Sequence, residues 1–212
     1  MKKAFFFLLL LNFSIAYSQK QDEALTIDPE VKQWTNSDRQ YLLENLIRSK
    51  AELVKETAGL TKEQWNFKET PDRWSINQVI EHISMWEMLI SHDISRALAD
   101  GPKPDLSKTS RPDSVFVTFI MEEKPHISTD YTKPFTYTVP MGINEGKNNL
   151  EWFLKLRNEA ISHLTTTNDD LRSYNLKPGS PDIHQRYIII FGHCDRHLRQ
   201  IRKIKQHSNY PG

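Results

Sequence analysis

The chain has 212 residues, and its composition excludes several classes of protein. Hydrophobic residues make up 38% of it, with 10 Phe, 7 Tyr and 5 Trp, so it is not a disordered chain. Its 28 basic and 27 acidic residues leave no basic field for nucleic acid, and its single cysteine excludes an intramolecular disulfide.

The first eighteen residues are expected to be a signal peptide. Two lysines precede an apolar run, residues 4–11, which is too short to cross a bilayer, and the small residues Ala16 and Ser18 suit a cut before Gln19. Loss of the two lysines changes the net charge from +1 to −1. We therefore expect a periplasmic or secreted protein without stable membrane anchoring, in which residues 19–212 form one domain. An uncleaved N-terminal anchor is the alternative.

Two long helices are expected in the first half of the chain. The first covers about residues 37–58, where Ser37 and Gln40 have the spacing of a capping box. The second covers about residues 75–99, where Ser75 opens a capping box of the same kind. Each has apolar residues at helical spacing on one face, which predicts packing against other helices.

A long proline-rich connection, residues 101–144, follows the second helix. It contains short β-like stretches at Val115–Met121 and Phe135–Val139. A structureless loop of this length is unusual in a compact domain, so we expect a lid or rim that packs on one end of the helices.

Two more amphipathic helices are expected after the connection, at about residues 145–165 and 182–206. Arg157 is the one polar member of the apolar stripe of the third helix. Four such stripes of about twenty residues predict an all-α four-helix bundle with a long loop insertion between helices two and three.

Three of the eight histidines lie on the apolar stripes. His193 and His197 are four residues apart, so they point the same way from adjacent turns of the fourth helix. His82 occupies a core position of the second helix, one turn before Trp86, which could form a wall of the site. The other histidines are expected at the surface: His92, His126, His163, His184 and His207.

Burying three imidazoles without compensation is costly, and a shared cation removes that cost. We therefore predict one divalent metal ion, zinc, nickel, iron or manganese, held by His82, His193 and His197. The alternative is three separately satisfied core histidines. His92 and Asp130 are candidates for a fourth ligand, and Asp195 for a carboxylate that contacts a ligand imidazole. Cys194 is expected to be a small core side chain.

At these residues the sequence resembles the DinB-like superfamily, which includes YfiT-type metal-dependent hydrolases and thiol-dependent transferases. The segments that carry the resemblance are Thr61–Trp65 (TKEQW), Trp74–His82 (WSINQVIEH) and His193–His197 (HCDRH). It spans about residues 37–205. It implies an up-up-down-down bundle with one metal ligand on helix two and two on the last helix, and, in many members, a homodimer.

The resemblance and the three imidazoles together favour a metal-dependent hydrolase that uses a metal-bound water on a small-molecule substrate. The spacing identifies no catalytic acid or base. Two alternatives stay open: a non-enzymatic bundle stabilised by its metal, and a thiol-dependent transferase. A pocket that reaches the metal would favour an enzyme, and a basic pocket would favour thiol transfer.

Overall fold

The computed structural model describes residues 33–122 and 138–212. All regular secondary structure in these ranges is helical. The predicted signal peptide lies outside the described residues. None of the described helices is both long and apolar enough to span a membrane. The helices are α2 (Asn36–Thr57), α3 (Lys62–Asn66), α4 (Ile76–Asp100), α5 (Pro104–Ser107), α6 (Asp113–Met121), α7 (Gly146–Thr166) and α8 (Ile183–Lys205).

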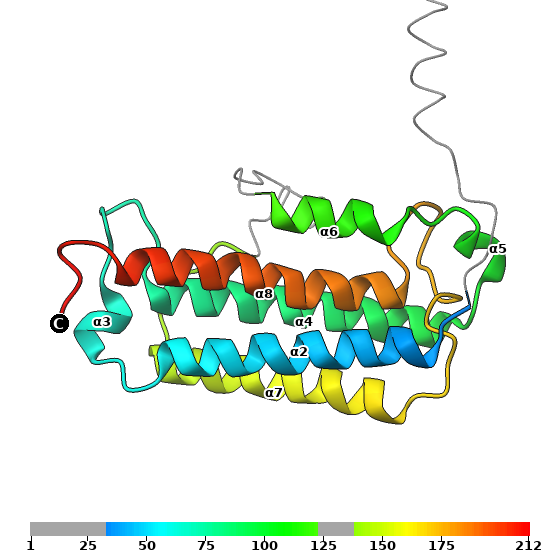
Figure 1. Ribbon diagram of the computed structural model, residues 1–212, viewed down its shortest axis with the longest axis horizontal. Helices are drawn as coiled ribbons and strands as arrows, with labels where there is room; N and C mark the ends of the chain where they lie inside the picture. The colour runs from blue at the N-terminus through cyan, green and yellow to red at the C-terminus, as the bar shows by residue number, and fades with distance from the viewer. Residues whose placement is uncertain (1–32, 123–137) are drawn as a thin grey trace, which may run out of the picture.

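The four long helices α2, α4, α7 and α8 form the predicted bundle (Figure 1). Helices α4 and α7 run parallel, and Asn149 Nδ2 donates to Asn77 Oδ1 at 2.8 Å near their starts. Helices α2 and α8 also run parallel, and Arg202 pairs with Glu52 at 2.7 Å near their ends. Around the bundle the helices follow in the order α4, α7, α2 and α8, and their directions in this order are up, up, down, down. In chain order the same helices run down, up, up and down.

The helix starts show one prediction confirmed and one that was wrong. The capping box at Ser75 is present, since its side chain accepts from Gln78 N. Helix α2, however, is capped by Thr35 and Asp38 rather than by Ser37 and Gln40. The carboxylate of Asp38 accepts from Thr35 N at 2.8 Å and also pairs with a buried arginine, which the neutral amide of Gln40 could not do.

The centre of the bundle contains the buried guanidinium of Arg157, the polar residue on the stripe of α7. Its exposed fraction is 0%, and it pairs with Glu87 of α4. It also donates to Ser49 Oγ at 2.6 Å and to the carbonyl of Leu46 at 3.0 Å, both on α2. Apolar clusters lie on both sides of this ion pair, so one side chain joins three of the four helices.

The connection between α4 and α7 differs from its prediction. Residues of the expected β-like stretch Val115–Met121 form helix α6, which runs alongside α8 rather than across one end of the bundle (Figure 1). Ile120 is buried there against Gly192, where a Cβ atom would lie 2.6 Å from Ile120 Cγ2. Packing of one apolar side against α8 therefore overrides the strand propensity of the sequence. The second β-like stretch falls mostly outside the described residues, and its last two residues form no strand.

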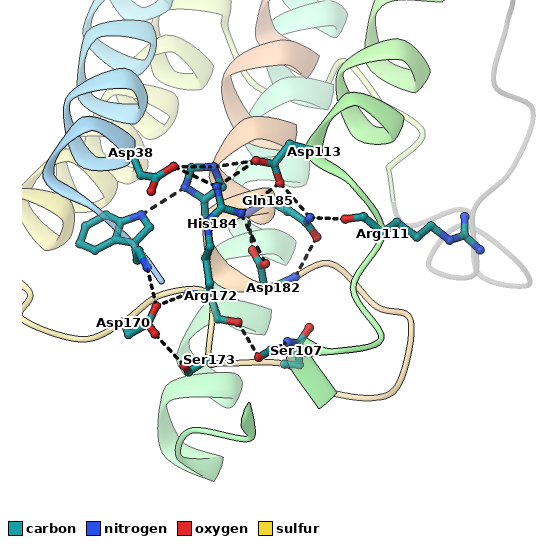
Figure 2. Close-up of polar contacts among 12 residues, drawn as sticks. Asp38, Ser107, Arg111, Asp113, Asp170, Arg172, Ser173, Asp182, His184 and Gln185 are labelled. Carbon is teal, nitrogen blue, oxygen red and sulfur yellow. Dashed lines mark hydrogen bonds and ion pairs between the residues drawn. The ribbon is translucent and has the colours of Figure 1, made fainter. Parts of the chain in front are cut away.

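A buried polar network fastens the start of α6 to the bundle (Figure 2). Arg172 pairs with Asp113 of α6 and Asp38 of α2, both at 2.9 Å. Gln185 of α8 donates to the carbonyl of Arg111 at 2.7 Å. The start of α6, within the connection between α4 and α7, is therefore held at the end of the bundle where α2 and α8 begin.

His184 lies inside this network, which corrects the prediction that it is a surface residue. Its exposed fraction is 1%, because it sits in the first turn of α8 facing α2 and α6. Its Nδ1 accepts from Trp34 Nε1 at 3.2 Å, and its Nε2 lies 3.5 Å from Asp113 Oδ2. His163 is also partly buried, with its Nδ1 2.7 Å from Tyr187 Oη.

Candidate metal centre

The structure brings His82, His193 and His197 together between α4 and α8. One ring nitrogen from each lies within 4.8 Å of the others. The ring centroids are 4.5 Å apart for His193 and His197, and 5.0 Å and 4.8 Å from His82 to each. His82 and His197 have exposed fractions of 8% and 6%, and His193 is half-buried. The predicted ligand set therefore forms one cluster.

Helical periodicity explains this convergence. His193 and His197 extend from adjacent turns of α8 on the side that faces α4. His82 lies in the second turn of α4, which runs antiparallel to α8. The start of α4 and the end of α8 therefore meet, and the three imidazoles replace apolar side chains at this level of the core.

Two of the imidazoles are oriented by oxygen acceptors. His82 Nδ1 lies 2.5 Å from the carbonyl oxygen of Thr138, and His197 Nδ1 lies 2.8 Å from Gln200 Oε1. A ring nitrogen that donates to a carbonyl oxygen carries the proton, so Nε2 of both rings keeps its lone pair. The Nε2 atoms of His193 and His197 are 3.1 Å apart. Two ring nitrogens this close can bind one cation when both present a lone pair, and neutral imidazole is the form that divalent zinc, nickel, iron and manganese accept.

Burial keeps these rings neutral. It lowers the pKa of His82 to about 4, and the positive charge of Arg196 acts in the same direction. It lowers the pKa of His197 to about 3, together with the positive charge of Arg196 and Arg199 and the charge that His82 gains when acid protonates it. Both side chains are therefore in their metal-binding form at neutral pH, beside two arginines.

Two tryptophans enclose the cluster. Trp74, just before α4, has its ring centroid 4.8 Å from that of His82 and 6.4 Å from that of His197. Trp86, one turn after His82, lies 5.2 Å from His193. Trp86 was expected to form a wall, whereas Trp74 was not. Flat apolar walls of this kind reduce the access of water to the imidazoles.

Other candidates lie away from the cluster. The buried thiol of Cys194 lies 3.8 Å from the carbonyl oxygen of Ser49, and burial raises its pKa to about 12. Asp195 pairs with Arg48 at 2.7 Å instead of orienting a ligand. His92 is exposed on α4, and Asp130 lies outside the described residues.

Sequence reasoning missed both groups that orient the candidate ligands His82 and His197. Gln200 follows His197 by three residues on the same helix, so its spacing was a usable signal. Thr138 contributes a main-chain carbonyl from the connection, and a carbonyl group has no residue-type signature.

Comparisons with known proteins identify the family of the chain. A model of the DinB superfamily matches residues 45–201. The chain therefore belongs to the DinB superfamily. A similar solved structure is that of YfiT from Bacillus subtilis, described as a probable metal-dependent hydrolase with an unusual four-helix bundle topology. The two are 13% identical, with a TM-score of 0.49 over 85% of this chain and 93% of that chain. No curated protein matches.

Proposed function

We propose that this protein is an exported, metal-dependent hydrolase that acts on a small substrate. The observation that carries the proposal is the convergence of the three imidazoles of His82, His193 and His197 in one cluster, where His82 and His197 are buried and oriented by oxygen acceptors. A divalent ion in such a site lowers the pKa of water and polarises the oxygen of an ester, amide or phosphoryl group.

The number of ligands supports an enzyme over a purely structural site. Among the described residues, the group that could hold a metal has three members, His82, His193 and His197. Closed structural zinc sites have four protein ligands, whereas catalytic sites have three and an open position. The half-buried His193 lies on the more accessible side of the cluster, where a substrate would approach.

Charge near the cluster supports a substrate with a negative group. Arg196 and Arg199 extend from α8 beside His197 and contribute positive charge to its surroundings. Arg196 donates to the carbonyl of Glu122 at the end of α6, which holds its guanidinium near this edge of the site. A bound dication would add to the same field, so an anionic ester or phosphoester fits better than a neutral one.

The test is hydrolysis of paired chromogenic esters, one neutral and one anionic, by protein loaded with each of the four metals. We expect metal-dependent turnover that favours the anionic ester and falls at least about 100-fold in His193→Ala, because loss of the ion removes several kcal/mol of transition-state stabilisation. His92→Ala is the matched control, since His92 is exposed on the same bundle. Equal turnover in His193→Ala and His92→Ala, or none by a stoichiometrically loaded protein, would contradict hydrolysis.

The same arginines favour a second candidate, thiol-dependent transfer, because small thiols such as glutathione carry carboxylates. The loaded protein would then consume glutathione in the presence of an electrophile, and Arg196→Gln would raise the KM for the thiol. The absence of metal-dependent thiol consumption would remove this candidate.

A further inference from the structure

The segment that returns from the long connection lies across the start of α4. We call residues 138–144 the strap. Three of its main-chain groups contact α4: Asn77 Nδ2 donates to the carbonyl of Asn144 at 2.8 Å, Gly142 N donates to Glu81 Oε2 at 2.7 Å, and the carbonyl of Thr138 accepts from His82. The Thr138 contact therefore ends on His82, a candidate metal ligand, and the Gly142 contact ends on Glu81, the residue before it.

Polar contacts contribute much of what holds the strap, since Pro140 is its one buried apolar residue. Met141 and Ile143 are each 73% exposed, and Val139 is 51% exposed. By contrast, the α4 side chains that contact the strap, Asn77 and Glu81, are buried. Loss of its donor would leave the buried carboxylate of Glu81 without a hydrogen-bond partner, which is unfavourable, so Glu81 and the Gly142 amide depend on each other.

The backbone of Gly142 is shaped for this contact. Its φ angle is +69°, a conformation that side chains rarely adopt. It also lies against the side chain of Gln78, where a Cβ atom would be 3.3 Å from Gln78 Cγ. A glycine therefore allows the strap to turn close to α4 and direct its amide at Glu81.

We propose that the strap is a positioning element for the metal centre, with Glu81 as its main fastening residue. The inference rests on the metal site of the proposed function. The Thr138 carbonyl holds the His82 ring with Nε2 directed at the cluster, so docking of the strap favours metal binding. By linkage, metal at His82 favours docking of the strap by the same factor.

Hydrogen exchange and zinc affinity test this reciprocity. Zinc should slow exchange in a peptide that covers residues 138–144, with a factor of about 5–150 at the Gly142 amide. Glu81→Ala should weaken zinc binding about 10-fold or more, and Glu81→Gln, which keeps an oxygen acceptor, should restore most of it. Glu159→Ala, an exposed change on α7, is the control and should leave both readouts unchanged.

Three results would overturn the inference. The first is zinc binding that leaves exchange in the strap unchanged. The second is a Glu81→Ala protein that binds zinc as tightly as the Glu159→Ala control. The third is a loss of exchange protection in α2 and α7 of Glu81→Ala that is as large as the loss in the strap. Neither readout uses hydrolysis, so a loaded protein without esterase activity would contradict the proposed reaction and leave the strap inference standing.

Discussion

His197 Nδ1 lies 2.8 Å from Gln200 Oε1, one turn further along α8. This contact keeps the proton on Nδ1 and the lone pair on Nε2, which faces His193. Gln200→Leu should therefore weaken zinc binding about 10- to 100-fold, as loss of a partner of a ligand histidine usually does. Gln200→Glu should bind zinc at least as tightly as the wild type. Competition with a chromophoric chelator measures both, and Lys203→Leu, an exposed position, is the control.

The lowered pKa values of His82 and His197 predict how the metal-free protein responds to acid. Unfolded histidines bind protons near pH 6.5, whereas these two do so near pH 4 and pH 3 in the folded state. The unfolded state binds more protons between these values, so the free energy of unfolding should fall as the pH drops from about 6.5 to 4. The two groups together should contribute up to about 3 kcal/mol per pH unit. Urea unfolding at pH 6.5 and 5.0 measures this.

The matched comparison is the double variant His82→Gln, His197→Gln. Its free energy of unfolding should change less between the two pH values than that of the metal-free wild type. The same pH dependence in both proteins would show that other groups cause it.

The Arg157–Glu87 pair predicts a large loss of stability when one partner is removed. Burial alone raises the pKa of Glu87, and Arg157 opposes this effect. Arg157→Met would leave the carboxylate buried without its partner, and the expected cost is about 3–5 kcal/mol in the free energy of unfolding. The double variant Arg157→Met, Glu87→Met should recover much of it. A cost below about 1 kcal/mol for Arg157→Met would contradict the pairing.

Close packing of Gly192 against Ile120 predicts that α6 is sensitive to a single methyl group. Gly192→Ala would place a Cβ atom 2.6 Å from Ile120 Cγ2, so α6 or α8 must shift at a cost of about 1–3 kcal/mol. Adding Ile120→Ala should relieve part of that cost, which a double-mutant cycle measures by thermal unfolding. Additive effects of the two changes would show that the residues do not contact each other.

The sequence predicted the bundle well because its helices carry local signals. Apolar spacing placed all four long helices within one or two residues of their ends, and Ser75 marked the start of α4. Helix α6 was missed because Val115–Met121 is rich in β-branched and aromatic residues. Contact with α8 determines its conformation, and a long-range contact leaves little trace in the local pattern.

The histidine cluster was predictable for the same reason: His82, His193 and His197 replace apolar residues in regular stripes. His184 was misjudged because it stands at the very start of α8, where burial depends on segments distant in the chain, including Trp34 and Asp113. The carbonyl of Thr138 could not be foreseen, since its position depends on the path of the connection.

The most direct test of the metal centre is the metal content of the purified protein by elemental analysis, together with that of His193→Ala and His197→Ala. We predict one divalent ion per chain in the wild type and substantially less than one in each variant. Circular dichroism should show that both variants keep the helical fold. Stoichiometric metal that persists unchanged in both variants would contradict the assignment of His193 and His197 as ligands.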